Sequence, residues 1–463
     1  MHDAIGGRAK ETRATSRYVV FATASVALLM GSIDSTIVAT ALHTLTVDLH
    51  ASLAWTSWTI TGYLLGQTVA MPIAGRLSDS LGRKRMFLVY VVTFTAASLL
   101  CGLSVNIYML IGFRFVQALG GGGFMPSASG LVSDRFGKDR DRAIGLFSSV
   151  FPLGALLGPA LGGVIITYLP WRAIFFLNVP VGVVLVILMI VILPASERLH
   201  APAIDAAGTA LMSAGLFLLM LGINQLGQQG IHAALPWLLL VVGLGLLAGF
   251  LVRQEHARHP IIPPSLLRRR AFAIVNVLNL MYGASALGVF QLVPLFAQDA
   301  YGMNALEAGT LLTVRAVGMI MIAGVASMAM RRTGYRAPMV VGFLLVAVGV
   351  AIMAFPPPQG LGPYGWLGLA ALLCGLGVGS AGPASNNAAI DLMPDQVAAI
   401  SGLRGMFRQV GGIIAVSIAA LLLDGSPHPA AVMSGVFVGM AVIALLSVPI
   451  IAKVPERRRR GPA

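Results

Sequence analysis

The sequence predicts an all-α, polytopic membrane protein, and three observations lead to that fold class. Hydrophobic residues make up 57% of the 463 positions and charged residues only 10%, whereas a soluble domain averages roughly 25% charged residues. The apolar residues fall in runs of roughly 20, the helix length that crosses about 30 Å of hydrocarbon. The lysine and arginine residues gather in the short polar segments between these runs. We therefore expect membrane-spanning helices joined by short loops.

Counting the apolar runs predicts about fourteen transmembrane helices. Their predicted centres are Met30, Leu65, Thr95, Gly120, Ala155, Val184, Leu218, Gly245, Gly288, Met319, Val346, Gly375, Val410 and Met440. The predicted segments are a cytoplasmic tail (1–18), a six-helix bundle (19–197), two additional helices (198–253), a cytoplasmic linker (254–271), a second six-helix bundle (272–453) and a cytoplasmic tail (454–463).

The distribution of basic residues predicts the orientation. Lysine and arginine are retained in cytoplasmic loops, and here they fall almost entirely in alternate loops and in both tails. We therefore expect both termini in the cytoplasm and a first helix that is retained rather than cleaved. This topology accounts for the net charge of +14 without nucleic acid as a partner. The 27 arginines against 4 lysines fit a high-GC bacterial gene, so the bacterial inner membrane is the expected location.

Among the charged residues that interrupt apolar runs are Asp34 in the first span and Arg114 in the fourth. A charge at such depth costs several kcal/mol unless it is hydrated or paired. We expect Asp34 to face a water-filled cavity, where a carboxylate can alternate between a proton and a cationic substrate. The alternative is a structural carboxylate that is bound by neighbouring hydroxyls such as Ser35 or Thr36.

A charged turn between the second and third spans carries the first family resemblance. Its sequence is Gly75-Arg-Leu-Ser-Asp79-Ser-Leu-Gly82-Arg83-Lys-Arg. It resembles the G-x-x-x-D-R-x-G-R-K/R loop of the major facilitator superfamily, with serine in place of the first arginine. The resemblance implies that Asp79 stabilises an outward-facing state through contacts between bundles, with Arg83 and Arg142 as candidate partners. The alternative is that these charges only fix the topology.

Three further patterns resemble the same superfamily. Arg114 and Gln117 resemble its intramembrane R-x-x-Q-G motif, although Ala118 and Leu119 intervene before the glycines. The run Gly154-Ala-Leu-Leu-Gly158-Pro159-Ala-Leu-Gly162-Gly163 matches its exporter motif, although glycines four residues apart by themselves indicate close helix packing. The run Trp171-Arg-Ala-Ile-Phe-Phe-Leu-Asn178-Val-Pro-Val-Gly182 looks like a signature of the fourteen-helix drug:proton antiporter branch.

The resemblance implies the fold and a mechanism. The major facilitator fold has two six-helix bundles, here with two inserted helices, and substrate binds near the bilayer midplane between the bundles. Asp34 would carry protons and Arg114 would modulate them. Candidates to line the substrate cavity are Trp58, Tyr63, Gln117, Asn279, Phe290, Gln291, Arg315, Met319 and Asn386. Arg315 could instead bind a lipid phosphate, and the asparagines could instead pair between helices.

The implied function is proton-coupled export of amphipathic compounds, cationic or neutral. No cofactor is expected, because the chain lacks a G-x-x-x-x-G-K-[ST] motif and the proton gradient is the available energy source. No metal site is expected either, since His256 and His259 lack acidic or cysteine companions. One alternative is a dedicated exporter of a single antibiotic, siderophore or sugar. A remoter one is a membrane sensor or enzyme. The expected partners are drugs, protons and lipids, and an outer-membrane or adaptor partner is left open.

Overall fold

The computed structural model is helical, with no strand among the residues that the structure describes. These are residues 17–148, 150–192, 205–257, 260, 262, 264–392, 394, 396–423 and 426–454. Outside them lie most of the predicted N-terminal tail, the boundary predicted at 197 and 198, His259, and the C-terminal tail from residue 455.

The N-terminal half contributes one group of helices. In chain order they are α1 (Arg17–Ile37), the 3-10 turn η1 (Val38–Ala41), α2 (Leu42–Asp48), α3 (Leu53–Leu81), α4 (Arg83–Gly102), α5 (Ile107–Phe136), the 3-10 turn η2 (Gly137–Asp139), α6 (Arg140–Ser148), α7 (Val150–Tyr168), α8 (Arg172–Phe176) and α9 (Asn178–Ile192). In this N-terminal bundle α3 and α4 pack on α5, and α7 packs on α1.

The remaining helices form an inserted pair and a second bundle. The pair is α10 (Ala206–Gln229) and α11 (Ala234–His256). The C-terminal bundle contains α12 (Pro264–Leu267), α13 (Arg270–Tyr282), the π turn η3 (Gly283–Gly288), α14 (Val289–Tyr301), α15 (Ala305–Thr333), α16 (Arg336–Ala354), α17 (Pro363–Ile390), α18 (Val397–Leu423) and α19 (Pro429–Ile451). Here α15 and α16 pack on α17, and α16 packs on α19.

The predicted helix count agrees with these elements. Thirteen stretches of the described chain are long and apolar enough to cross a membrane, and α3, which is less apolar because it carries residues such as Gln67, Arg76 and Asp79, is a fourteenth helix of spanning length. All the predicted centres lie within these helices, with Gly288 ending the π turn. The fold class is therefore confirmed.

Polar residues set the starts of several helices. Asn106 Oδ1 accepts a hydrogen bond from the Met109 backbone N–H at 2.8 Å and caps α5. At α15, Asn304 and Glu307 form a reciprocal capping box with bonds of 2.9 and 3.0 Å. Such caps satisfy backbone donors that the first helical turn leaves free. The caps therefore determine the residue at which each helix begins.

The two bundles are joined by polar contacts at one end of the molecule. Hydrogen bonds between described residues cross from one bundle to the other there, among them Arg140 to Asp391 at 2.6 Å, Arg76 to Gln396 at 3.0 Å, and the Ala399 backbone N–H to Asp79 at 2.8 Å. We call this end the Asp79 end, and the charge pattern predicts that it faces the cytoplasm.

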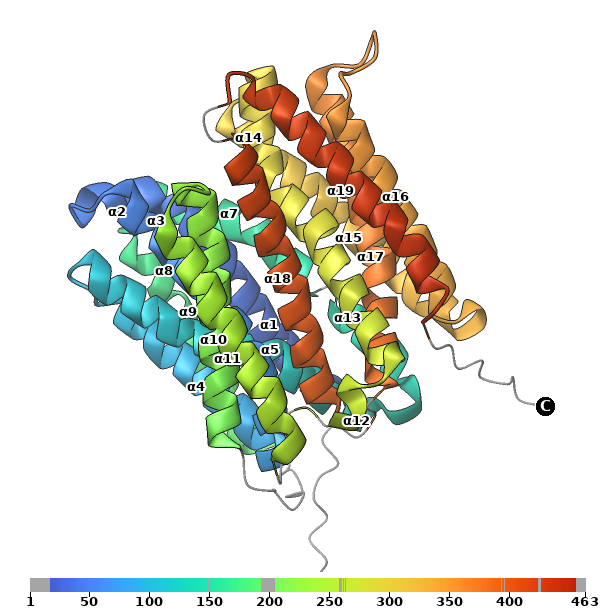
Figure 1. Ribbon diagram of the computed structural model, residues 1–463. Helices are drawn as coiled ribbons and strands as arrows, with labels where there is room; N and C mark the ends of the chain where they lie inside the picture. The colour runs from blue at the N-terminus through green and yellow to red at the C-terminus, as the bar shows by residue number, and fades with distance from the viewer. Residues whose placement is uncertain are drawn as a thin grey trace, which may run out of the picture.

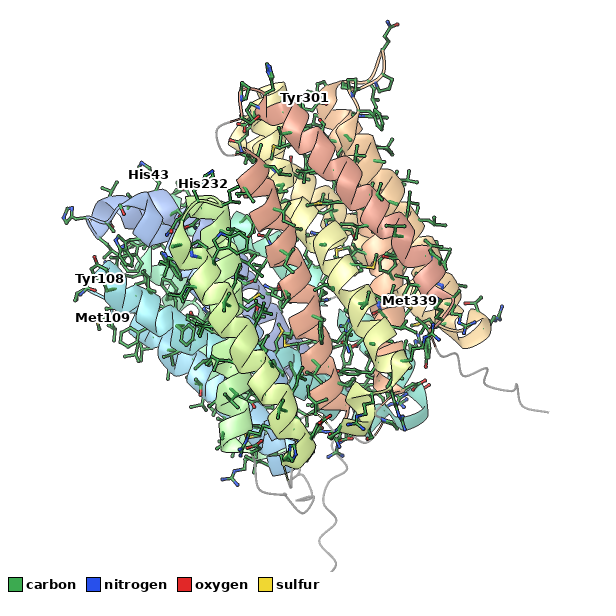
Figure 2. The ribbon with its side chains drawn as sticks, viewed as in Figure 1. His43, Tyr108, Met109, His232, Tyr301 and Met339 are labelled. Atoms are coloured by element: carbon green, nitrogen blue, oxygen red, sulfur yellow. The ribbon has the colours of Figure 1, made fainter. Side chains whose placement is uncertain are left out.

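Other segments can be placed relative to the Asp79 end. The start of α1 and the end of α19 belong to it, as the bonds from Arg17 to Asp139 and from Arg336 to the Val454 carbonyl show. In Figure 2, His43, His232 and Tyr301 lie at the opposite end. The inserted pair lies beside the junction of the bundles, where α10 contacts both α3 and α18 (Figure 1).

Candidate functional site

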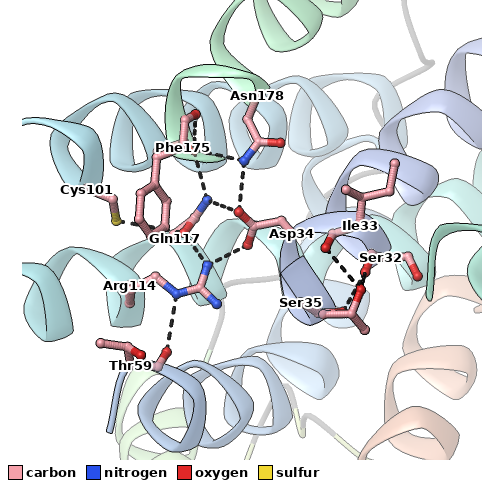
Figure 3. Close-up of polar contacts among 12 residues, drawn as sticks. Ser32, Ile33, Asp34, Ser35, Thr59, Cys101, Arg114, Gln117, Phe175 and Asn178 are labelled. Atoms are coloured by element: carbon pink, nitrogen blue, oxygen red, sulfur yellow. Dashed lines mark hydrogen bonds and ion pairs between the residues drawn. The ribbon is translucent and has the colours of Figure 1, made fainter. Parts of the chain in front are cut away.

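Asp34 lies at the centre of a buried polar cluster in the N-terminal bundle. Its side chain, near the end of α1, is 0% exposed. Arg114 Nη1 donates to its Oδ2 at 2.5 Å. Gln117 Nε2 and Asn178 Nδ2 donate to its Oδ1 at 3.0 and 2.8 Å. Figure 3 shows these three side chains reaching the carboxylate from α5 and from the start of α9. The sequence-predicted pair of Asp34 and Arg114 is thus brought into direct contact.

A second layer of contacts fixes the three donors. Ser98 of α4 accepts hydrogen bonds from Gln117 at 3.1 Å and from Asn178 at 3.0 Å, and its hydroxyl donates to the Phe175 carbonyl at 2.9 Å. Arg114 Nη1 also donates to Gln117 Oε1 at 2.7 Å. Because every member has a partner, the cluster holds one defined geometry around the carboxylate.

The guanidinium of Arg114 has further partners from α3. Its Nε donates to the Thr59 carbonyl at 3.2 Å, and its charge lies 4.0 Å from the centre of the Tyr63 ring. Such cation–π contacts contribute more when they are desolvated, and Arg114 is 1% exposed. The Tyr63 hydroxyl is buried and lacks a hydrogen-bond partner. Tyr63 and Gln117, both predicted to line a substrate cavity, are therefore part of the Asp34 cluster in this conformation.

The expected environment of Asp34 and the alternative to it both differ from this conformation. The carboxylate does not face a water-filled cavity, because three side-chain donors occupy the positions that water would take. The hydroxyls of Ser35 and Thr36 do not bind it either, since they donate to backbone carbonyls of their own helix, at Ser32 and Ile33. Hydroxyls on a helix commonly bond in this way to the preceding turn.

The glycine motif of α7 determines how closely that helix approaches α1. Gly154, Gly158 and Gly162 face α1, and a Cβ atom at each would overlap Ser32, Thr36 or Thr40. Ser32 Oγ donates to the Phe151 carbonyl across this contact at 2.5 Å. The glycines therefore let α7 support the segment of α1 that carries Asp34. Pro159 faces away from this contact and is exposed.

Asp79 lies at the second predicted site, where α3 meets α18. Arg83 Nη2 lies 3.0 Å from Asp79 Oδ1, and Asp79 Oδ2 accepts the bond from Ala399 at the start of α18. Gly75 allows this approach, because a Cβ there would overlap the backbone at Ala398. Gly82 has a φ of 101° and ends α3 in a conformation that favours glycine.

Arg142 does not join the Asp79 site. Its side chain is exposed, and among the described residues the partners of Asp79 are Arg83 and the start of α18. The other carboxylate on Arg83 belongs to Asp134 of α5, which the sequence-based prediction omitted. A short helix, α6, carries Arg142 away from the contact, and the spacing of charges in the sequence does not reveal that turn.

The remaining cavity candidates are dispersed. Trp58 and Met319 are half-buried, and Gln291 is exposed. Asn279 accepts a bond from Ser385 at 3.2 Å, so it pairs between helices. Asn386 is 0% exposed, and both of its amide atoms lack a partner. The guanidinium of Arg315 lies 4.0 Å from the centre of the Phe290 ring.

Asn178 and Ser98 are absent from the predicted site residues. Asn178 belongs to the signature that follows Trp171, so the motif offered a signal for it. Ser98 offered none, because a serine in an apolar helix is ordinary. The packing of α4 against α9 brings Asn178 onto Asp34 and Ser98 onto Asn178.

A multi-pass helical bundle with a charged site buried between its helices is the architecture expected of a membrane transporter. The described residues contain no group of three or more His, Cys, Asp or Glu side chains that could hold a metal ion. A family model described as Major Facilitator Superfamily matches residues 24–416. The chain belongs to that superfamily.

Several proteins named for drug transport or drug resistance are similar in sequence. The Tetracenomycin C resistance and export protein of Streptomyces glaucescens is 32% identical over 404 residues, which is 86% of this chain and 74% of the relative. A Multidrug resistance protein B homolog of Mycobacterium tuberculosis is 31% identical over 405 residues, with the same coverage. The Multidrug transporter protein MdtP of Bacillus subtilis is 32% identical over 348 residues, which is 74% of this chain and 64% of the relative.

A solved structure shares the fold. The human organic anion transporter MFSD10 (TETRAN) superposes with a TM-score of 0.70, covering 94% of this chain and 99% of that chain, at 14% sequence identity. This likeness concerns the arrangement of the helices alone.

Proposed function

We propose that the protein is a secondary active exporter of the bacterial inner membrane, which exchanges small amphipathic compounds for protons by alternating access. The observation that carries the proposal is the fully buried Asp34 carboxylate, bound by Arg114, Gln117 and Asn178. The export direction is supported by the glycine motif of α7 and by the names of the relatives, which describe multidrug transport or antibiotic export.

Asp34 is proposed as the proton carrier. While the carboxylate is ionised, its charge is neutralised by Arg114 at 2.5 Å. Protonation removes that charge and leaves the guanidinium uncompensated at a depth where a lone charge is costly. Arriving protons thus favour a different arrangement of α1 and α5, and release of the proton restores the ion pair. This exchange links proton occupancy to conformation.

Asp79 is proposed as the conformational latch, as the resemblance implies. Its bond to Ala399 connects the bundles at the predicted cytoplasmic end, together with the bonds from Arg76 and Arg140. Opening toward the cytoplasm requires that these bonds break. The same proposal implies that both termini lie on the cytoplasmic side of the membrane.

A second candidate is a dedicated exporter of one metabolite on the same fold. The similarity to a relative named for the export of one antibiotic favours it. The two candidates differ in breadth: competition among unrelated compounds supports multidrug export, and saturable transport of one compound alone supports the dedicated exporter.

The proton coupling is tested with purified protein in acid-loaded vesicles. Ethidium, a lipophilic cation, or the neutral N-phenyl-1-naphthylamine is added outside, and proton release is followed with a pH-sensitive dye. We expect release with the wild type and with Asp48→Asn, an exposed neighbour, and background release with Asp34→Asn. Coupled release that persists in folded Asp34→Asn protein would falsify the assignment of Asp34.

A further inference from the structure

Three arginines in the C-terminal bundle lie inside the protein without counter-ions. They are Arg315 of α15, and Arg404 and Arg408 of α18. Among the described residues, none of the three guanidinium groups has a hydrogen bond or an ion pair, and the Nε atom of each is buried without an acceptor. Arg404 is 3% exposed, whereas Arg315 and Arg408 are half-buried. This contrasts with Arg114, which is neutralised by Asp34.

The acidic residues of this half of the chain lie elsewhere. Between residues 272 and 453 they are Asp299, Glu307, Asp391, Asp395 and Asp424. The first two are exposed at the far end, and Asp391 binds Arg140 and Tyr335 at the Asp79 end. Asp395 and Asp424 lie outside the described residues, beyond the ends of α17 and α18. No described carboxylate of this half of the chain thus neutralises the arginines.

The three arginines converge around the π turn η3. Arg404 and Arg408 are one helical turn apart on α18 and share a face. The backbone of Arg408 packs directly on Gly283, where the π turn begins. Arg315 lies over Phe290, just beyond the end of that turn. Because all three side chains carry the same charge, they repel one another. Short π segments of this kind are frequent at functional sites.

The helix that carries Arg404 and Arg408, α18, also meets the other bundle, but through a different face. Gly402 and Gly405 approach Met71 of α3 so closely that a Cβ atom would overlap it at either position, whereas Arg404 and Arg408 lie on the side of α18 that is turned toward η3. The two arginines are therefore carried by a helix that contacts both bundles, and a compound passes between the bundles in alternating access.

We infer that Arg315, Arg404 and Arg408 bind the acidic group of a transported amphipathic compound, a carboxylate, sulfonate or phosphate. A buried guanidinium without a partner is costly, and its planar fork binds such oxygens through paired, charge-assisted hydrogen bonds. A ligand that brings negative charge removes the repulsion within the cluster. The inference rests on the proposed export function, and it departs from the cationic or neutral substrates that the sequence predicts.

The test compares two compounds with one aromatic skeleton. 8-Anilinonaphthalene-1-sulfonate carries a sulfonate, and N-phenyl-1-naphthylamine lacks it. Binding to the full chain in phosphatidylcholine nanodiscs is measured by equilibrium dialysis, with empty nanodiscs subtracted. We expect the wild type to bind the sulfonate more tightly. Each of Arg404→Gln and Arg408→Gln should weaken sulfonate binding about tenfold, the loss of one charge-assisted contact, while binding of the neutral compound is unchanged.

Controls separate a charge effect from a folding defect. Arg332→Gln changes an exposed arginine of α15, the helix that carries Arg315, and should leave both affinities unchanged. Arg404→Lys and Arg408→Lys keep the charge and should retain most of the sulfonate preference. If wild-type protein shows no preference for the sulfonate, or if folded Arg404→Gln and Arg408→Gln proteins keep it, the inference is wrong.

An anionic lipid headgroup has the same chemistry and is distinguished by composition. If phosphatidylglycerol in the nanodisc displaces the sulfonate competitively, the site holds lipid and the inference fails; undiminished affinity supports a transported compound. Binding needs no proton gradient, so the test is independent of Asp34. Proton-coupled release without a sulfonate preference would leave the proposed export in place and overturn the inference alone. Sulfonate binding that depends on the arginines but is not accompanied by coupled proton release would support the anion site and overturn the proposed proton-coupled export.

Discussion

Buried charges in this protein differ in how they are partnered. Asp34 accepts three side-chain hydrogen bonds, and Arg114 is bound by carboxylate, amide and carbonyl oxygens. Arg404 and Arg408 have no such bonds among the described residues. A satisfied polar network holds one geometry, whereas an unsatisfied charge is retained at a cost. The first arrangement suits a proton site that must hold a defined state, and the second suits a site that a ligand completes.

The role of Asn178 can be tested by Asn178→Leu. The substitution removes the donor at 2.8 Å from Asp34 and fills similar space with apolar atoms. We expect substrate-induced proton release to slow about tenfold, because a lost hydrogen bond to a charged group is worth roughly 1.5–3 kcal/mol. The initial rate in acid-loaded vesicles measures this. Gln229→Leu, at an exposed position of α10, should keep the wild-type rate. An unchanged rate in Asn178→Leu would mean that Asn178 has no part in coupling.

At the scale of elements, α1 and α7 depend on glycine spacing. A methyl group at Gly158 would overlap Thr36, whereas nothing lies within 4 Å of a Cβ atom at Gly163 of the same helix. We expect Gly158→Ala to destabilise the protein by about 1–3 kcal/mol, the typical cost of overpacking. Gly163→Ala should be neutral or slightly stabilising, because alanine favours helix. Thermal unfolding of the two variants in one detergent compares them. Equal melting temperatures would contradict the close contact of α7 with α1.

The helices α10 and α11 are joined by a pH-dependent ion pair between Asp205 and Arg253. Asp205 caps α10 by accepting from the Gly208 N–H at 3.0 Å, and Arg253 lies 2.7 Å from its carboxylate. The hydrogen bond from Arg253 holds the pKa of Asp205 below its ordinary value of 3.8. A depressed carboxyl pKa stabilises the fold above the unfolded pKa, and the stabilisation is lost as the pH falls from there through the folded pKa.

Asp205→Asn keeps a capping acceptor but removes that charge. We expect the variant to melt at a lower temperature than the wild type at pH 7, and the difference to shrink as the pH falls below about 4. Melting curves at several pH values give the comparison. If the difference in melting temperature is constant across this range, the stabilisation by the Asp205–Arg253 contact does not depend on ionisation of Asp205.

At the scale of the whole molecule, the contacts at the Asp79 end hold the bundles together. Their effect can be measured as the distance between two spin labels, one on each bundle, at the exposed positions of Arg142 and Arg332. The two free cysteines, Cys101 and Cys374, are first replaced by alanine. Asp79→Ala removes the acceptor for Ala399 and the partner of Arg83. We expect the distance distribution between the labels to shift toward longer values, because lost contacts of about 1 kcal/mol or more change a two-state population at least fivefold.

A matched control is Glu255→Gln, which removes an exposed ion pair with Arg268. Such pairs contribute little, so the distribution should stay as in the wild type. If Asp79→Ala gives the same distribution as this control, the latch assignment fails.

The sequence was sufficient to predict where the helices lie along the chain, but not which side of each helix faces its neighbours. Apolar runs of membrane length have few other solutions than helices, and all the predicted centres lie in helical segments. Which side chains meet depends on the rotation of each helix, and runs that are apolar on every side carry little information about it. Asp34 and Arg114 were predictable as buried charges, since each stands out alone. Ser98, and the absence of counter-ions around Arg404 and Arg408, became visible only when the helices were packed.

Movement of the uncompensated arginines within the membrane would make transport depend on voltage. One elementary charge that crosses the whole membrane potential changes in energy by about 2.3 kcal/mol per 100 mV. If rocking of the bundles carries Arg315, Arg404 and Arg408 through a tenth of that drop, their combined change is about 0.7 kcal/mol per 100 mV. An interior-negative potential draws these charges toward the cytoplasm. A bound anion would cancel part of this pull, so the empty and loaded transporter would feel the same membrane potential differently.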